Sequence, residues 1–470
     1  MRKVLKRVGI ALSVLTIGAL IYFYPLINQF IRFNPIVTEA NFDEPADKAE
    51  AQQQDFEYLA QILDYDRSFS AIAKEKFTQD LETLRQGSSA LSDAQFFMAT
   101  HELMAIADNA HTGADTVSAF RQFNRSGLDF YNFADGMYVV RAHRSHEGLL
   151  GQKLVSIEGN DIASVLVGLE KYSGGPIVRR YLISLYFVRS PELLHAAGLA
   201  GSQNSVTYLL EGADGQQSEQ MFDALPSAAE TEFAYRHPYH TLRPDPLPDE
   251  DGDWIRVLGG EGTAIPITLK NDGDLVLSAP LGAGRYIRVN YLQEYPEQPV
   301  ETEMLDALHD VPDGGFPFLV VDLRWNPGGD LGHAIPFAKR IGETVAANGK
   351  VYVIVGPQTF SAAIVTAALI KQYAPQQTMI IGEPMGDRPQ FWAERGQAFV
   401  LPNSGYYIGY ATGFHDWERP CKSAIEYCFP PAQREAAEIG DLGVDQLIQP
   451  TFAEYAAGKD AVLDWVLAQQ

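Results

Sequence analysis

The chain has 470 residues, 46% of them hydrophobic and 20% charged, so it is long enough for two or three domains with sizeable cores. Its 36 Lys and Arg residues against 60 Asp and Glu residues give a formal net charge of −24. A chain this acidic repels phosphate backbones, which argues against a nucleic-acid-binding protein.

The first 30 residues have the pattern of a membrane anchor. Four positive charges lie within residues 1–7, no charge follows from Val8 to Tyr24, and the apolar run reaches Ile27. This is about the ~20 residues that a spanning helix needs. Because a basic flank stays in the cytoplasm, we predict a single-pass helix in a bacterial-type inner membrane, with the remaining chain on the periplasmic or extracellular side. A cleaved signal peptide is the alternative, although no Ala-x-Ala site directly follows the apolar run.

Three segments of different character follow. Residues 31–55 are polar and acidic and predict a linker. Residues 56–126 carry apolar residues at helical spacing and predict a helical domain, with Ser92 as a helix cap. Residues 127–245 predict a small β-rich module with helices, and the stretch up to residue 253, rich in Pro, His and acidic residues, is typical of an exposed connector.

Residues 254–470 alternate between strand and helix patterns, which predicts an α/β core with a mainly parallel sheet. The expected strands are 285–291, 319–323, 351–355 and 378–381, and the expected helices are 300–308, 333–347, 361–372 and 461–467, with a hairpin over 399–410. Ligands of such sheets lie at the carboxyl ends of the strands. Gly328-Gly329 and Ser361 each fall just beyond such an end.

The pairing of a serine with a glycine turn indicates acyl-transfer chemistry. Ser361 at a helix N-terminus lies at the positive end of the helix dipole, which favours a developing anion. A helix cap explains a lone serine equally well, and a Gly-Gly pair is usually only a turn. A nucleophilic serine also needs a base. Lys371 lies ten residues further along the same helix, at ~15 Å, so it cannot be that base.

Five segments together resemble one family, the tail-specific or C-terminal-processing serine peptidases, in their tricorn-core-like branch. They are Asp-Leu-Arg-Trp-Asn-Pro-Gly-Gly (322–329), Thr-Phe-Ser-Ala-Ala (359–363), Gly-Glu-Pro-Met-Gly-Asp-Arg-Pro (382–389), Asp-Asn-Ala-His-Thr (108–112) and Gly-Gln-Lys-Leu-Val-Ser-Ile-Glu-Gly (151–159). The resemblance spans about residues 56–460. It implies a ClpP/crotonase-like core, preceded by the helical domain and a degenerate PDZ-like module.

One departure from the family pattern concerns the general base that would deprotonate the serine. Members with a Ser-Lys dyad place the lysine in a Gly-Lys-Gly turn, and here that turn is Gly-Asp-Arg at 386–388. The resemblance therefore assigns Ser361 as the nucleophile and His111 as the base. It also implies an oxyanion hole from the amides of Gly329 (or Gly328) and Ala362. A carboxylate should orient His111. The candidates are Glu418, which we favour, and Asp416 and Glu394.

The resulting functional prediction is a serine hydrolase that cleaves peptide or protein substrates without a metal or cofactor. The alternatives are a non-catalytic binding member of the same fold and a scaffold protein that uses the helical domain. Cys421 and Cys428 are expected to form a disulfide outside the cytoplasm. The histidine pairs 143/146 and 237/240 and the acidic run 249–253 lack the spacing of zinc or calcium sites, so we interpret them as solvated loop residues.

Overall fold

The computed structural model describes residues 30–470, apart from residues 88–89, 117–121, 228–240, 246–251, 261, 271–272 and 422–426. Residues 1–29, and with them nearly all of the predicted membrane anchor, lie outside the described residues. Among the helices of the described part, none is long and apolar enough to cross a membrane.

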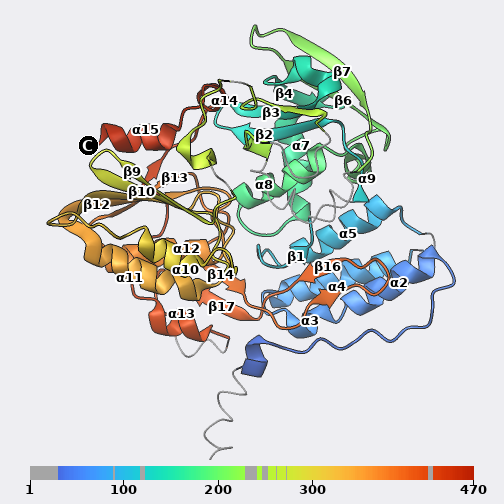
Figure 1. The fold of residues 1–470 in the computed structure, drawn as a ribbon. Coiled ribbons are helices and arrows are strands. Elements are labelled where there is room, and N and C mark those ends of the chain that lie inside the picture. The colour runs from blue at the N-terminus through green and yellow to red at the C-terminus, as the bar shows by residue number, and fades with distance from the viewer. Residues whose placement is uncertain are drawn as a thin grey trace, which may run out of the picture.

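The C-terminal core is built on a six-stranded sheet with the order β18-β13-β12-β11-β10-β9 (Figure 1). All neighbouring strands are parallel except β9, which runs antiparallel to β10. The strands are β9 (Val276–Leu281), β10 (Gly284–Val289), β11 (Phe316–Asp322), β12 (Val345–Val355), β13 (Thr378–Gly382) and β18 (Gln446–Leu447). The predicted parallel α/β sheet is thus present.

Helices cover both faces of this sheet, because its strands are apolar on both sides. One face packs against α10 (Val300–Asp306), α11 (Ala334–Thr344) and α12 (Ala362–Tyr373). The other face packs against α15 (Ala461–Ala468). One boundary differs from the sequence prediction: the helix expected to reach residue 347 ends at Thr344, because Val345 already pairs with Phe316 of β11.

The helical domain contains α2 (Lys48–Leu59), α3 (Ile62–Tyr65), α4 (Ala71–Arg85) and α5 (Asp93–Ala105). Ser92 caps α5 in a capping box with Gln95, which confirms the predicted cap. The hairpin β15 (Phe399–Val400) and β16 (Tyr407–Gly409) comes from far along the chain but lies beside these helices (Figure 1). Its strand β16 pairs with β1 (Gly113–Ala114), which begins two residues after His111.

The described part of residues 127–256 contains a seven-stranded sheet and three α-helices. Its strands are β2 (Leu128–Phe133), β3 (Gly136–His143), β4 (Lys153–Ile157), β5 (Asn160–Asp161), β6 (Ser205–Glu211), β7 (Gln217–Asp223) and β8 (Trp254–Arg256), and its helices are α7 (Ile162–Leu169), α8 (Ile177–Val188) and α9 (Pro191–Ala196). The remaining elements are β14 (Gln390–Ala393), which pairs with β17 (Gly413–Asp416), and the helices α13 (Pro430–Glu435) and α14 (Phe452–Ala456).

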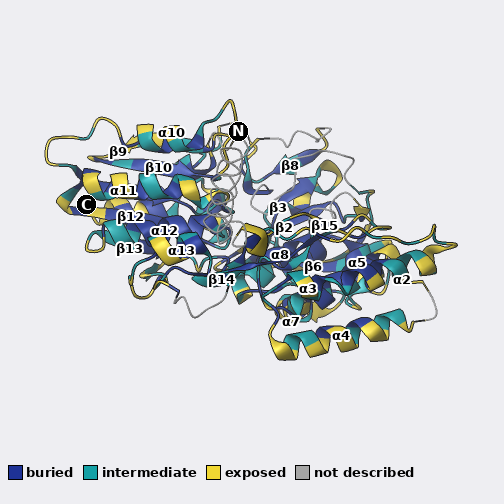
Figure 2. Cartoon of the chain, turned by 90° about the horizontal axis from the view of Figure 1, so that it is seen from below, coloured by how far each residue is buried: buried dark blue, intermediate teal, exposed yellow. Residues whose placement is uncertain are grey.

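One buried hydrophobic cluster joins the helices α2–α5 to the sheet of residues 128–256, and two others lie on the sheet of the core. Figure 2 shows mostly buried strands at the centre of the core, whereas α4 has a long exposed face. The loop that carries His111 follows α5 and contacts the core, since Asp108 pairs with Arg388 and Asn109 bonds to Trp392.

Candidate active site

Ser361 occupies a strained turn between β12 and α12. Its backbone angles are φ 53° and ψ −123°, a conformation that L-residues rarely adopt. Strain of this kind costs about 1–3 kcal/mol and persists only where the surroundings impose it. A tight turn from strand to helix also raises the serine hydroxyl above the carboxyl end of the sheet. Ser361 is partly exposed there, so a substrate can reach it.

The glycine turn lies directly against this serine. A Cβ placed on Gly328 would be 2.7 Å from the Cβ of Ser361, and one on Gly329 would collide with the carbonyl oxygen of Leu292. Both glycines have positive φ angles, 110° and 123°. The close approach and the backbone conformation therefore both require glycine at these positions.

The backbone amides around Ser361 differ in whether they donate a hydrogen bond. The Gly328 amide donates to Asn326 Oδ1 at 2.8 Å. The amides of Gly329 and Ala362 have no acceptor among the residues that the structure describes. Of the residues predicted for the oxyanion hole, Gly329 and Ala362 therefore carry amides without an acceptor in the described part of the chain, whereas the amide of Gly328 is engaged.

Two buried side chains hold the turn and the serine together. Asn326 Nδ2 donates to the carbonyl of Val289 at 3.0 Å, and the carbonyl of Asn326 accepts from the amide of Phe360 at 3.1 Å. Thr359 Oγ1 donates to the carbonyl of Leu323 at 2.8 Å and accepts from the amide of Gly356 at 2.9 Å. These bonds join the ends of β10, β11 and β12 around Ser361.

The structure brings His111 next to the segment that contains Ser361. Its ring stacks on Phe360, the residue before Ser361, with centroids 4.2 Å apart, and on Phe391 at 5.2 Å from the other side. Both ring nitrogens are buried and make no hydrogen bond with the described residues, although Nδ1 lies 3.2 Å from Oδ2 of Asp387. The two aromatic rings fix the plane of the imidazole between them.

Contacts across the domain boundary hold the loop that carries His111. Asp108 pairs with Arg388 at 2.9 Å and with Arg180 at 2.7 Å. Asn109 bonds to both backbone groups of Trp392, donating at 3.1 Å and accepting at 3.3 Å. On the helical side, Thr112 Oγ1 donates to the buried Asp66 at 2.6 Å. The loop is therefore docked on the segment that contains Asp387.

The carboxylate beside His111 is Asp387, whereas the structure gives Glu418 other partners. The oxygens of Glu418 accept from Gln390 Nε2 at 2.7 Å and from the Leu442 amide at 2.9 Å. Asp416 also accepts from Gln390, at 3.1 Å, and Glu394 lies 3.3 Å from His415 Nε2. Asp387 stands where the dyad lysine of the similar family would be, and this departure is the sequence signal that could have pointed to it.

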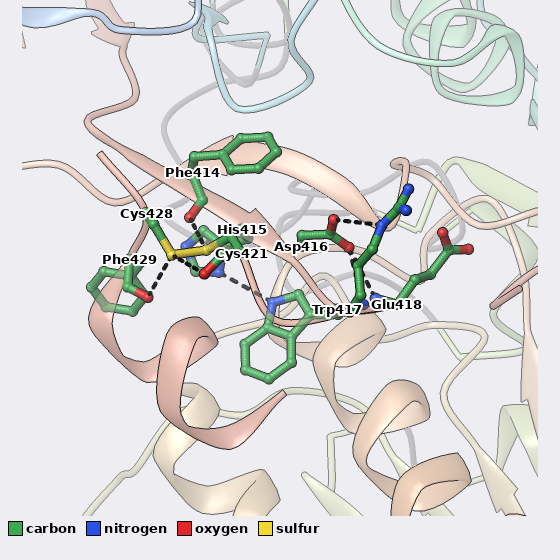
Figure 3. Close-up of a disulfide and its surroundings, with 9 residues drawn as sticks. Phe414, His415, Asp416, Trp417, Glu418, Cys421, Cys428 and Phe429 are labelled. Atoms are coloured by element: carbon green, nitrogen blue, oxygen red, sulfur yellow. Dashed lines mark hydrogen bonds and ion pairs between the residues drawn. A yellow bond between two sulfur atoms is a disulfide. The ribbon is translucent and has the colours of Figure 1, made fainter. Parts of the chain in front are cut away.

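The predicted disulfide between Cys421 and Cys428 is present. It links the segment after Glu418 back to the region of β17, and Figure 3 shows it beside Phe414, His415 and Phe429. Trp417 Nε1 donates to His415 Nδ1 at 3.2 Å, and burial lowers the pKa of His415 although Glu394 acts in the opposite direction. The crosslink thus lies beside β17 and the segment that follows Glu418.

Within the described residues, no group of three His, Cys, Asp or Glu side chains is arranged to hold a metal ion. The histidines at 237 and 240 and most of the acidic run at 249–253 lie outside the described residues.

Comparison with solved structures supports the fold. No protein-family model matches the chain, and no curated protein matches it. Mature CPAF complexed with lactacystin matches with a TM-score of 0.56 and 13% identity, over 90% of this chain and 98% of that one. The S499A mutant of CPAF matches with a TM-score of 0.54 and 12% identity, over 89% and 96% of the two chains.

Two further neighbours bear names from the family that the motifs resemble. The photosystem II D1 C-terminal processing protease has a TM-score of 0.37 at 15% identity, over 87% of this chain and 98% of that one. The tricorn protease has a TM-score of 0.35 at 14% identity, over 90% of this chain and 37% of that one. The similarity to CPAF confirms the predicted resemblance at the level of the fold, a mixed α/β structure with several sheets.

Proposed function

We propose that this protein is a serine peptidase that cleaves peptide bonds in peptide or protein substrates. The observation that carries the proposal is the strained backbone of Ser361, placed against a glycine turn whose φ angles and close contacts require glycine. A helix cap needs neither feature. His111, stacked on the residue before Ser361, supplies the base that a serine nucleophile requires.

The proposed reaction uses these groups in sequence. His111 Nε2 removes the proton from Ser361 Oγ as the oxygen attacks the substrate carbonyl carbon, and it later gives this proton to the leaving amine. Asp387, 3.2 Å from Nδ1, holds the imidazole in the required tautomer after a small rotation of the ring. The amides of Gly329 and Ala362 donate to the oxyanion, and loss of one such donor typically costs about 3 kcal/mol. Water then hydrolyses the acyl-enzyme by the same route.

The proposal extends to the architecture and the location of the protein. The sheet with helices on both faces supports a ClpP/crotonase-like core, and the sheet of residues 127–256 supports a degenerate PDZ-like module. Residues 1–30 would anchor the chain in a bacterial-type inner membrane, with the catalytic part on the periplasmic or extracellular side. The disulfide between Cys421 and Cys428 supports such an oxidising compartment.

A fluorophosphonate probe tests the proposal directly, because it reacts only with an activated serine. We expect stoichiometric labelling of the wild type, loss of labelling in Ser361→Ala, and unchanged labelling in Ser218→Ala, which alters an exposed serine of β7. Labelling that survives Ser361→Ala would show that another residue is the activated nucleophile, and absence of labelling from the folded wild type would favour the non-catalytic binding protein instead.

A further inference from the structure

The ring of His111 is one member of a column of stacked aromatic rings. Phe391 of β14 has its centroid 5.2 Å from that of His111, and His415 of β17 lies 4.7 Å from Phe391 with the two ring planes 12° apart. Phe429 follows at 4.8 Å from His415. The pairing of β14 with β17 places Phe391 directly opposite His415, and side chains opposite each other lie on the same face. The column therefore connects His111 to a pair of strands outside the candidate active site.

Both ring nitrogens of His415 face a fixed neighbour. Trp417 Nε1 donates to Nδ1 at 3.2 Å, as Figure 3 shows, and the two side chains belong to residues that are each 1% exposed. Because an indole N–H only donates, Nδ1 accepts and Nε2 carries the proton. Nε2 lies 3.3 Å from Oε1 of Glu394. One tautomer and one orientation of the His415 ring therefore suit both neighbours.

Glu394 has an unusual backbone conformation directly after β14. Its φ angle is 60°, which residues other than glycine rarely adopt and which Ser361 shares. The carbonyl of Glu394 accepts from the amide of Thr412 at 3.0 Å. Strain of this kind persists only where the surroundings impose it. The fold thus holds the chain in a turn that leaves this carboxylate beside His415.

The two histidines interact electrostatically across the ring of Phe391. Burial lowers the pKa of His415, and the charge of His111 acts in the same direction, whereas Glu394 opposes the shift. A neutral His415 adds no positive charge near His111, which itself becomes positive when it accepts the proton of Ser361. The face of the Phe391 ring then attracts that charge.

We propose that His415 is a positioning residue for His111 and acts through the ring of Phe391. This inference rests on the proposed function. Phe360 contacts the His111 ring from one side, so the plane of the imidazole depends on Phe391 at the other. His415 packs against Phe391 and holds it there. The stack confines the imidazole to rotation within its own plane, which keeps Nδ1 beside Asp387.

Saturation kinetics of fluorophosphonate labelling in the full chain test this role. The maximum rate, kinact, depends on the reacting groups, whereas the half-saturating concentration depends on binding of the probe. We expect His415→Leu to lower kinact about 10- to 100-fold and to change the half-saturating concentration less than about twofold, because the column loses a flat ring. His415→Phe keeps a flat ring and should restore kinact to within about fivefold of the wild type.

The matched control removes a buried ring elsewhere. Phe77 of α4 is 1% exposed and lies 5.3 Å from the ring of Phe69. Phe77→Leu should lower the free energy of unfolding in urea but leave kinact unchanged.

Glu394 offers a second pair of variants if His415→Leu does not fold, because its side chain is 32% exposed. Glu394→Ala should lower kinact about 3- to 10-fold, since Nε2 of His415 loses its partner. Glu394→Gln provides an amide oxygen as acceptor and should restore the rate.

An NMR measurement reports on the His111 ring itself. In protein labelled with ¹³C-histidine, His111→Gln assigns the Cε1–H resonance of His111. This resonance should shift in His415→Leu and in Glu394→Ala, because ring currents depend on the stack, and should keep its position in Phe77→Leu.

A fall of kinact in His415→Leu no larger than in Phe77→Leu would overturn the role of His415. Equal rates of His415→Leu and His415→Phe, or of Glu394→Ala and Glu394→Gln, would also overturn it, as would an unchanged His111 resonance. Absence of labelling from the folded wild type would instead overturn the proposed function.

Discussion

The two halves of the candidate active site are held by different kinds of interaction. Around Ser361, Asn326 and Thr359 are fully buried and bond to backbone groups of adjacent strand ends in one sheet. Around His111, the contacts join residues up to 283 positions apart, and the ion pair between Asp108 and Arg388 is half exposed. Ser361 is thus held at the end of a sheet by buried bonds, whereas His111 lies on a docked loop.

This difference indicates where the site can be disturbed. Buried hydrogen bonds in a sheet are insensitive to salt and expensive to leave unmade, whereas exposed ion pairs contribute little and are screened. Substitutions on the nucleophile side should therefore cost stability and activity together. Substitutions on the histidine side should mainly cost activity.

The largest effect is expected at Asp387, where the two halves meet. Asp387→Asn should lower the labelling rate of Ser361 by about 1,000- to 10,000-fold, because the imidazole loses the carboxylate that selects its tautomer. Glu418→Gln should lower the rate less than about tenfold, since the partners of Glu418 are Gln390 and Leu442. Labelling kinetics of both variants decide between the two carboxylates, and the reverse order would restore Glu418 as the orienting residue.

On the nucleophile side, Thr359→Val should destabilise the protein by about 2–4 kcal/mol, because it leaves two buried backbone groups without a partner. The labelling rate should fall about 100-fold through the displaced Ser361. Thr359→Ser keeps the hydroxyl and serves as the matched control. Urea unfolding and labelling are the measurements, and equal behaviour of the two variants would show that the hydroxyl does not hold this turn.

On the histidine side, lowering the pH should reduce the hydrogen-exchange protection of α5 before that of α12. Burial lowers the pKa of His101 to about 4 from 6.5, although the hydrogen bond to Tyr172 opposes the shift. The unfolded chain therefore binds a proton more readily between these values. The contribution of neutral His101 to the free energy of unfolding is therefore fully present above pH 6.5. It is lost as the pH falls towards 4, by about 3 kcal/mol in total.

Hydrogen exchange at pH 7 and pH 5 measures this effect. Protection should fall in α5 and the loop at 106–112 but not in α12, and His101→Gln should remove the pH dependence. If α5 and α12 lose protection together, or if neither loses it, His101 is not the cause of the pH dependence.

The smallest effect is expected at Asp108. The side chain is 52% exposed, so Asp108→Asn should change stability by less than about 1 kcal/mol and lower the labelling rate roughly fivefold. Added salt should slow labelling of the wild type but not of the variant. Asp80→Asn, which breaks the exposed Lys76–Asp80 pair, is the control. A salt response that is identical in wild type and Asp108→Asn would exclude this pair as the support of the loop.

The same difference explains what the sequence could predict. The alternating strands and helices after residue 254, the glycine turn and the serine at the head of a helix are local patterns, and the structure contains each of them. The placement of Gly328 against Ser361 follows from two neighbouring parallel strands, so the positions of both were predictable.

The position of His111 depends on contacts between distant segments, which no local sequence pattern encodes. The resemblance identified His111, but its sandwich between Phe360 and Phe391 joins three distant segments. The pairing of β16 with β1 likewise brings the hairpin at 399–410 to the helical domain, away from the core to which its sequence position assigned it. Glu418 was chosen by residue type alone, and only the fold shows Asp387 beside the imidazole.

The most direct test is a crystal structure of the wild type after reaction with a fluorophosphonate. The account predicts a phosphonyl group on Ser361 Oγ, with its oxygen about 2.7–3.1 Å from the amides of Gly329 and Ala362 and His111 Nε2 within about 3.2 Å of Oγ. An adduct whose oxygen faces solvent, with the His111 ring turned away from Ser361, would contradict it.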